Sequence, residues 1–204
     1  MRVFEEAGLP AGLLQLLPGG ADVGQALVEA PEVRVISFTG STAAGRKVGE
    51  AAGRLLKRAH LELGGNNALI VLPGADLDLA ASAGAFGSFL HQGQICMTTG
   101  RHLVHESLVE EYTARLADKA KNLPVGDPAS GQVALGPIID ERQRDNIDRL
   151  VRDAKDSGAQ IAAGGTYEGL FYSPTVLTGL TPDNPAWTQE IFGPVAPILA
   201  FSSI

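Results

Sequence analysis

The sequence predicts an α/β protein with parallel strands, and three observations support this fold class. Short apolar runs alternate with longer segments of helical periodicity, which is the pattern of strand–helix–strand units. Glycine-rich turns, such as those at 18–20 and 64–65, separate these segments. Hydrophobic residues make up 45% of the 204 residues and charged residues 19%, so the chain can build one packed domain or two small ones.

The elements of the first part follow from apolar runs and the turns that end them. Ser41 or Thr42 is expected to cap the helix that follows the second strand. In chain order we expect a strand at 13–17 ended by a Pro-Gly-Gly turn, a helix at 23–29, a strand at 33–38, a helix at 43–59, and strands at 61–63 and 69–72.

The second part continues the alternation with longer helices. We expect a helix from Asp76 to about Leu90, a strand at 102–105, a helix at 108–122, a loop at 127–131, a charged helix at 140–157, and strands at 160–163 and 197–201.

The glycine pair Gly64-Gly65 is the expected domain boundary, which gives domains at 1–64 and 65–204. The first seven residues resemble the tail of a helix, and the strand at 197–201 is expected to leave an unpaired apolar edge. We therefore expect this chain to be a fragment of a longer protein.

Charge and composition exclude several classes of function. The net charge of −7 argues against a nucleic-acid partner or an anionic membrane surface. No apolar stretch approaches the length of a membrane span, and the acidic N-terminus does not resemble a signal peptide. A single cysteine without a disulfide framework fits a reducing compartment, so we expect a cytoplasmic location.

Cys96, the only cysteine, lies in the sequence Gly-Gln-Ile-Cys. Free cysteines are often simply buried as small apolar residues. The alternative is thiol chemistry, in which Cys96 is a nucleophile on a glycine-containing segment that a ligand can approach closely.

Two glycines, Gly40 and Gly45, lie at an expected strand-to-helix turn. Free backbone N–H groups and the helix dipole favour an anion at such a turn. The spacing is not that of the Gly-x-Gly-x-x-Gly fingerprint, and Val48 supplies no hydroxyl for a P-loop magnesium. A capped helix with packing glycines explains the same residues equally well.

Two carboxylates are further candidates. Glu62 lies in an apolar strand beside two glycines, a setting that suits a general base, although structural carboxylates at strand ends are commoner. Glu190 could accept hydrogen bonds from sugar hydroxyls, and Phe192 could pack on an aromatic ring; alternatively, they mark the start of a strand with a buried aromatic residue.

The histidines carry no metal-binding pattern. His60, His91, His102 and His105 do not show catalytic or metal spacing; His91 is close enough in sequence to Cys96 for a thiol–imidazole pair, but a solvated or core position is favoured for it. With one cysteine and scattered histidines, no metal site is expected.

Taken together and in this order, the motifs resemble the aldehyde dehydrogenase superfamily. The matching motifs are Phe-Thr-Gly-Ser-Thr at 38–42, Leu-Glu-Leu-Gly-Gly at 61–65, Gly-Gln-Ile-Cys at 93–96 and Glu-Ile-Phe-Gly-Pro-Val at 190–195. The resemblance covers essentially the whole chain. It implies part of a Rossmann-type cofactor domain, followed by part of an α/β catalytic domain.

The resemblance also implies oxidation of a small-molecule aldehyde to an acid with NAD or NADP, in proteins whose full-length members form homo-oligomers. Cys96 would be the nucleophile, forming a thiohemiacetal and then a thioester, and Glu62 would be the general base that makes the enzyme hydrolytic. Asn66-Asn67 replaces the usual lysine and looks like the benzaldehyde and vanillin dehydrogenase branch. The implied cofactor-binding residues are Gly40, Ser41, Gly45, Leu63, Glu190 and Phe192.

Two other hypotheses remain open at the level of sequence. The chain could be an inactive fragment that acts as a binding or interaction module, because the family's oxyanion-hole asparagine and adenosine-ribose lysine are absent. It could also be a generic nucleotide binder in which Cys96 is only packed.

Overall fold

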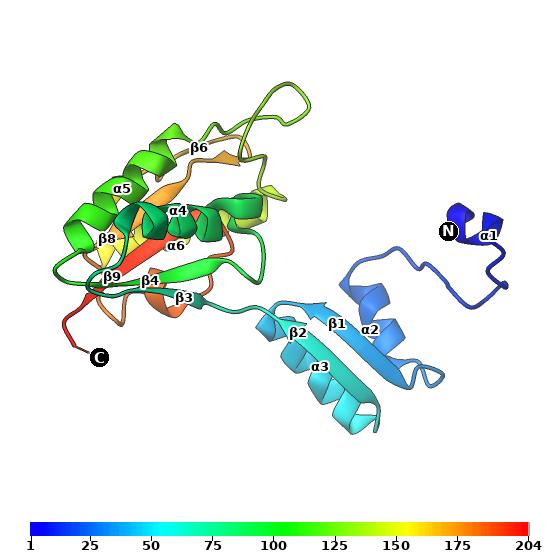
Figure 1. Cartoon of the computed structure of the whole chain (residues 1–204). Helices are drawn as coiled ribbons and strands as arrows, with labels where there is room; N and C mark the ends of the chain where they lie inside the picture. The colour runs from blue at the N-terminus through cyan, green and yellow to red at the C-terminus, as the bar shows by residue number, and fades with distance from the viewer. Residues whose placement is uncertain (204) are drawn as a thin grey trace. The chain divides into compact units, whose positions relative to one another are not determined.

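The computed structural model describes residues 1–203, which divide into two compact units, Met1–Gly64 and a second unit beginning at Gly65 (Figure 1). The α/β class is confirmed in both. That the first unit is a cofactor domain and the second a thiol domain stays a prediction. None of the helices in residues 1–203 combines the length and apolar character that crossing a bilayer requires.

The first unit contains a strand–helix–strand motif. Strands β1 (Val35–Gly40) and β2 (Arg58–Leu63) pair in parallel, and helix α3 (Thr42–Arg54) connects them. Helices α1 (Arg2–Glu6) and α2 (Ala21–Glu29) precede this motif. Helix α3 ends before residue 59, the limit expected from sequence, because Leu56 adopts a left-handed φ of 54° and the next strand begins at Arg58.

The expected strand at 13–17 is wrong. Residues 13–17 form a bend and irregular chain, and Leu13 and Leu16 are 71% and 68% exposed. A strand needs a neighbour to accept its backbone hydrogen bonds, and within residues 1–203 β1 and β2 pair only with each other. The apolar run therefore had the composition of a strand but no partner.

Ser41 caps helix α3, as expected, since its Oγ accepts a hydrogen bond from Ala44 N–H at 3.2 Å. We expect Ser41→Ala to destabilise α3 by about 1 kcal/mol, because a terminal N–H loses its partner. Hydrogen exchange of the α3 amides measures this change. Ser41→Asp, which retains a capping oxygen, should restore protection; equal exchange in all three proteins would contradict the prediction.

The second unit is built on a five-stranded sheet in the order β3-β4-β9-β8-β5. All neighbours are parallel except β5 and β8. The strands are β3 (Asn67–Val71), β4 (Thr99–His105), β5 (Gln160–Ala163), β8 (Thr175–Thr178) and β9 (Val195–Phe201), with a separate hairpin of β6 (Tyr167–Glu168) and β7 (Phe171–Tyr172).

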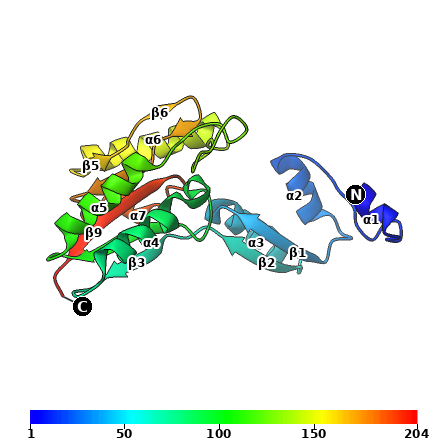
Figure 2. The same ribbon diagram turned by 45° about the horizontal axis from the view of Figure 1, so that its top comes forward.

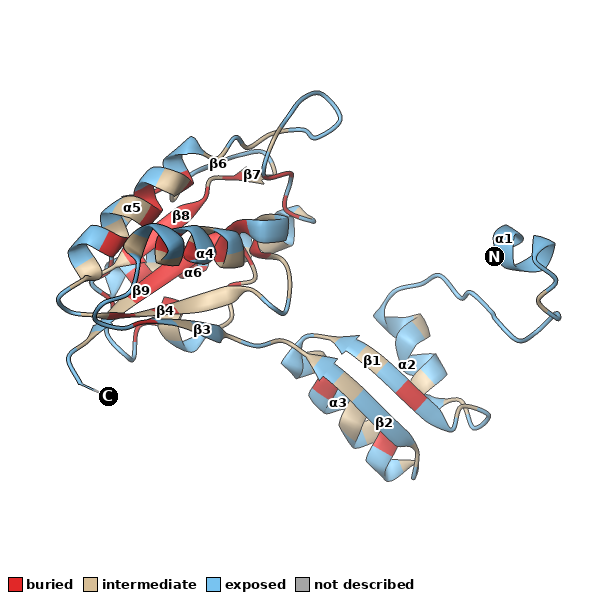
Figure 3. Ribbon diagram, viewed as in Figure 1, coloured by how far each residue is buried: buried red, intermediate tan, exposed pale blue. Residues whose placement is uncertain are grey.

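Helices cover both faces of this sheet (Figure 2). Helices α4 (Leu77–Phe89) and α5 (Val109–Asn122) pack in one core cluster with the strands, whereas α6 (Glu141–Asp156) and α7 (Pro185–Thr188) pack in another. Strand β8 contributes Val176 to the first cluster and Leu177 to the second. Figure 3 shows that buried residues concentrate on these strands and on the helix faces that meet them.

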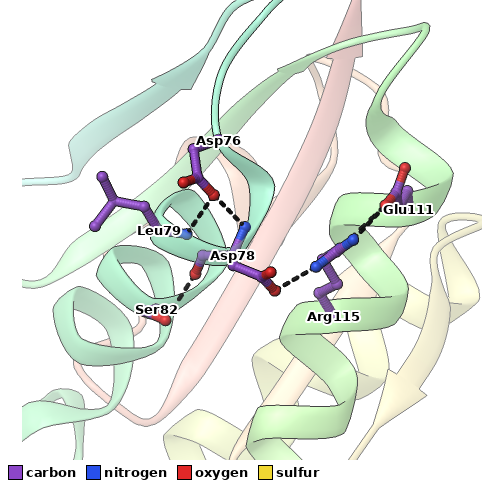
Figure 4. Close-up of polar contacts among 6 residues, drawn as sticks. All are labelled: Asp76, Asp78, Leu79, Ser82, Glu111 and Arg115. Carbon is purple, nitrogen blue, oxygen red and sulfur yellow. Dashed lines mark hydrogen bonds and ion pairs between the residues drawn. The ribbon is translucent and has the colours of Figure 1, made fainter.

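Polar contacts also fix α4 against α5 (Figure 4). Asp76 caps α4 by accepting hydrogen bonds from the N–H groups of Asp78 and Leu79, at 3.0 and 3.1 Å. Arg115 on α5 pairs with Asp78 on α4 and with Glu111 one turn earlier on its own helix. The capped end of α4 is thereby tied to the neighbouring helix.

The expected unpaired edge at 197–201 is wrong, although these residues do form a strand. Strand β9 lies inside the sheet, where it pairs with β8 through residues 195–197 and with β4 through 198–201. The short strand β8 was not predicted from the sequence, and without it β9 had no neighbour on that side. The chain therefore has no unpaired edge at β9.

Candidate active site

Cys96 lies on a tight turn, called here the thiol turn (residues 93–98), between the short 3-10 helix η1 (Leu90–Gly93) and strand β4. Thr98 closes this turn twice. Its N–H donates to Ile95 O at 3.0 Å, and its Oγ1 donates to Gly93 O at 3.0 Å. Cys96 is exposed, so the hypothesis of a packed core thiol does not describe it. His91 is also exposed, which is the solvated position that we favoured.

A second segment (residues 189–194, called here the Glu190 segment) packs beside the thiol turn. Glu190 Oε1 accepts a hydrogen bond from Gly65 N–H at 3.1 Å. Phe192 has a left-handed φ of 52°, a conformation that costs energy for a residue with a side chain. Gln143 on α6 holds it there, since its Nε2 donates to Ile191 O at 3.1 Å and to Phe192 O at 2.9 Å.

The two segments line a small open pocket with a cavity volume of about 20 Å³. The thiol turn contributes Ile95 and Thr98 to its wall, and the Glu190 segment contributes Glu190 and Phe192. Cys96 does not line the pocket, but both of those turn residues are within two positions of it. The pocket therefore lies beside the turn that carries Cys96, and Glu190 and Phe192 are part of its lining.

Gly93 makes the close approach of the two segments possible. Its φ is 66°, and a Cβ built on it would lie 2.0 Å from Gly193 O. We expect Gly93→Ala to destabilise the second unit by about 2–3 kcal/mol, because the methyl group would separate the segments and strain the backbone. Urea unfolding followed by the fluorescence of Trp187, the only tryptophan, measures this loss.

A matched glycine serves as the control. Gly74 also has a positive φ of 85°, but a Cβ there meets no atom within 4 Å. Gly74→Ala should therefore lose only the stability that a positive φ costs a residue with a side chain. Equal losses for Gly74→Ala and Gly93→Ala would show that the contact with Gly193 contributes nothing.

The residues predicted to lie near the phosphates of the cofactor are in the first unit. Gly40 ends β1 and Ser41 caps the 13-residue helix α3, so its free N–H groups start directly after the strand. Gly45 is buried, and a Cβ there would lie 2.3 Å from Leu63 Cδ2. Gly45 therefore lets α3 pack closely on β2.

Glu62 has a different setting from the one expected. It lies on β2, but its side chain is 68% exposed, and its Oε1 is 2.9 Å from His60 Nε2. Alternate residues of a strand face opposite sides, so the apolar neighbours Leu61 and Leu63 face away from Glu62. Its role as a general base stays a prediction.

A chain of buried polar groups starts at His102, which is fully buried, and it was not predicted from the sequence. Ser88 Oγ donates its one proton to Thr99 O at 2.8 Å, so it must accept from His102 Nε2 at 2.7 Å. His102 Nδ1 then accepts from the Tyr112 hydroxyl at 2.7 Å. Burial lowers the pKa of His102 from 6.5 to about 3, so the ring is neutral.

The predicted site residues thus fall into two groups. Glu190 and Phe192 come together beside the turn that carries Cys96, in the second unit. The remaining predicted residues Gly40, Ser41, Gly45, Glu62 and Leu63 lie in the first unit. Residues 1–203 contain no cluster of His, Cys, Asp and Glu that could hold a metal ion.

The strand–helix units and the thiol turn are those of a family of oxidoreductases. The sequence profile of the aldehyde dehydrogenase family matches residues 1–204, and the chain belongs to this family. Among curated proteins it is 71% identical to a vanillin dehydrogenase of Amycolatopsis sp. and 54% identical to a benzaldehyde dehydrogenase [NAD(+)] of Pseudomonas putida. The matches cover 100% and 99% of this chain but only 42% of each relative.

Solved structures agree with this assignment. An NAD-dependent aldehyde dehydrogenase from Sinorhizobium meliloti superposes with a TM-score of 0.95 at 39% identity, over 99% of this chain and 41% of its own. Betaine aldehyde dehydrogenase from Staphylococcus aureus, in complex with NAD+, also gives 0.95, at 32% identity, over 99% and 42%. The likeness to vanillin and benzaldehyde dehydrogenases expected from Asn66-Asn67 is confirmed.

Proposed function

We propose that the chain carries the thiol and part of the cofactor site of an enzyme that oxidises an aromatic aldehyde to a carboxylic acid. The single observation that carries this proposal is an exposed cysteine on a turn beside a pocket walled by Glu190 and Phe192, in a member of the aldehyde dehydrogenase family. The aromatic class of substrate rests on the names of the relatives, vanillin and benzaldehyde dehydrogenase.

Cys96 is the nucleophile. Its thiolate forms a carbon–sulfur bond with the aldehyde carbon, and the carbonyl electron pair becomes the alkoxide of a thiohemiacetal. The N–H of Cys96 donates to this oxyanion. When the alkoxide collapses, hydride leaves the carbon and a thioester remains, with bound NAD+ or NADP+ as the hydride acceptor.

Glu62 acts in the second half of the reaction. It takes a proton from water as the water oxygen attacks the thioester carbon. The carbon–sulfur bond then breaks, the acid leaves, and Cys96 is again a thiolate. Exposure of the Glu62 carboxylate suits this role, because the attacking water must reach it.

Each unit has residues that suit one part of a dinucleotide. The start of the 13-residue helix α3, directly after Gly40 and Ser41, offers free backbone N–H groups, which suits a pyrophosphate. Gly45 packs closely on Leu63, which holds α3 against β2 at this end of the helix. Glu190 can accept hydrogen bonds from ribose hydroxyls, and Phe192 offers a ring for the nicotinamide.

Reduction of NAD+ or NADP+ by the purified chain, with vanillin, benzaldehyde or propanal, tests the proposal. We expect reduction that depends on the aldehyde and is faster with the two aromatic substrates. If the folded chain reduced neither cofactor, the proposal that these 204 residues are active by themselves would be contradicted. That result would favour the hypothesis of a non-catalytic binding module.

A further inference from the structure

Asn67, the first residue of β3, holds the thiol turn from the side. Its Nδ2 donates to Cys96 O at 2.9 Å and to Thr98 O at 3.1 Å. A side-chain amide nitrogen has two protons, so this one group satisfies both carbonyls. Asn67 therefore joins the turn that carries the nucleophile to the edge strand of the sheet.

Both peptide groups that flank Cys96 are fixed in this way. Asn67 holds the Cys96 carbonyl, and Thr98 N–H holds the Ile95 carbonyl. Because the carbonyl and N–H of a trans peptide point in opposite directions, the bond to Ile95 O also sets the direction of Cys96 N–H. That N–H is the group that would stabilise the oxyanion.

Asn66 does the same for the Glu190 segment. Its Nδ2 donates to Trp187 O at 3.2 Å and to Gln189 O at 3.4 Å, directly before Glu190. Its Oδ1 packs against Gly100, where a Cβ would lie only 1.9 Å away. Two consecutive amides thus hold two segments that are far apart in sequence.

We propose that Asn66 and Asn67 are positioning residues with separate tasks. Asn67 orients the thiol turn for attack and oxyanion stabilisation, and Asn66 orients the Glu190 segment for the cofactor. This inference rests on the proposed function of the same site. Positioning of this kind matters because a shift of about 1 Å in a reacting group can cost about 10²-fold in rate.

Two reagents distinguish an effect on the orientation of Cys96 from an effect on its accessibility. Attack on p-nitrophenyl acetate forms an oxyanion and needs the Cys96 N–H, whereas alkylation by iodoacetamide forms none. We expect Asn67→Leu, which has a similar size but no donor, to slow acylation about 10–100-fold and alkylation less than about 3-fold. Asn67→Ser retains one donor and should fall between. Cys96 is the only cysteine, so both rates report on it alone.

Asn66→Leu is the matched control. We expect acylation of Cys96 to stay within about 3-fold of the wild-type rate. Hydrogen exchange at residues 187–192 should accelerate at least tenfold, and NAD+, titrated by Trp187 fluorescence, should bind about tenfold more weakly. Asn67→Leu should leave NAD+ affinity unchanged.

Equal acylation by wild type and Asn67→Leu would overturn the proposal. Parallel losses of acylation, alkylation and NAD+ affinity in both variants would also overturn it, since they indicate general loosening. Failure of the proposed function gives a different result: wild-type Cys96 would react with the ester no faster than the same thiol in the urea-unfolded chain.

Discussion

Cys96→Ser is expected to abolish covalent chemistry, with at least about a 10⁴-fold loss of both ester acylation and aldehyde oxidation. A serine hydroxyl is a far weaker nucleophile than a thiolate unless a base adjoins it, and removal of an enzyme nucleophile costs up to about 10⁶-fold. Mass spectrometry after incubation with p-nitrophenyl acetate measures the effect. Wild type should gain one acyl group, located at Cys96.

Met97→Leu is the appropriate control, because Met97 lies on the same turn and is 70% exposed. It should react within about twofold of wild type, since surface substitutions of this kind change little. Acylation of the Cys96→Ser chain at the wild-type rate would place the nucleophile elsewhere and remove the basis of the proposed mechanism.

His102→Ala is expected to destabilise the second unit by about 3–5 kcal/mol. The substitution leaves a cavity in a fully buried site, deprives the Tyr112 hydroxyl of its acceptor and takes one of two partners from the Ser88 hydroxyl. The Trp187 fluorescence transition in urea measures the loss. His105→Ala, on the same strand but half-buried, should cost less than about 1 kcal/mol. Similar losses for the two variants would contradict a special role for the buried chain.

The same histidine makes stability fall at acid pH. The unfolded chain binds a proton at His102 near pH 6.5, but the folded chain does so only near its lowered pKa of about 3. Between these values the unfolded state binds more protons, so the free energy of unfolding decreases as pH falls from 6.5. From pH 6.5 to pH 5 this decrease amounts to about 2 kcal/mol. His102→Ala should remove it, whereas His105→Ala should not.

The sequence predicted elements best where local pattern and tertiary context agree. Helices α5 and α6 begin and end within one residue of the expected limits, because their apolar faces have a strong period. The strand predicted at 13–17 is wrong, because a strand needs a neighbouring strand and the local pattern does not reveal whether there is one. Strand β9 was expected, yet its inner position depended on the unpredicted β8.

Of the candidate site, only the residues inside the four motifs could be predicted from the sequence. Four short motifs indicated Cys96 and Glu190; Asn66-Asn67 was noted only as a replacement of the usual lysine, and nothing local indicated that it holds these segments. Gln143 lies in a highly charged helix and reaches the Phe192 carbonyl 49 positions away. Such hydrogen bonds end on backbone carbonyls, so they require no particular residue type at the accepting position and leave no pattern in the sequence.

The order of strands has a consequence for synthesis. Strand β9 is the last strand of the described chain in sequence, but it lies between β4 and β8 in the sheet. On the ribosome, β4 and β8 emerge first and cannot be bridged until residues 195–201 leave the exit tunnel. The sheet of the second unit should therefore stay incomplete, and open to proteases and chaperones, until those residues have emerged.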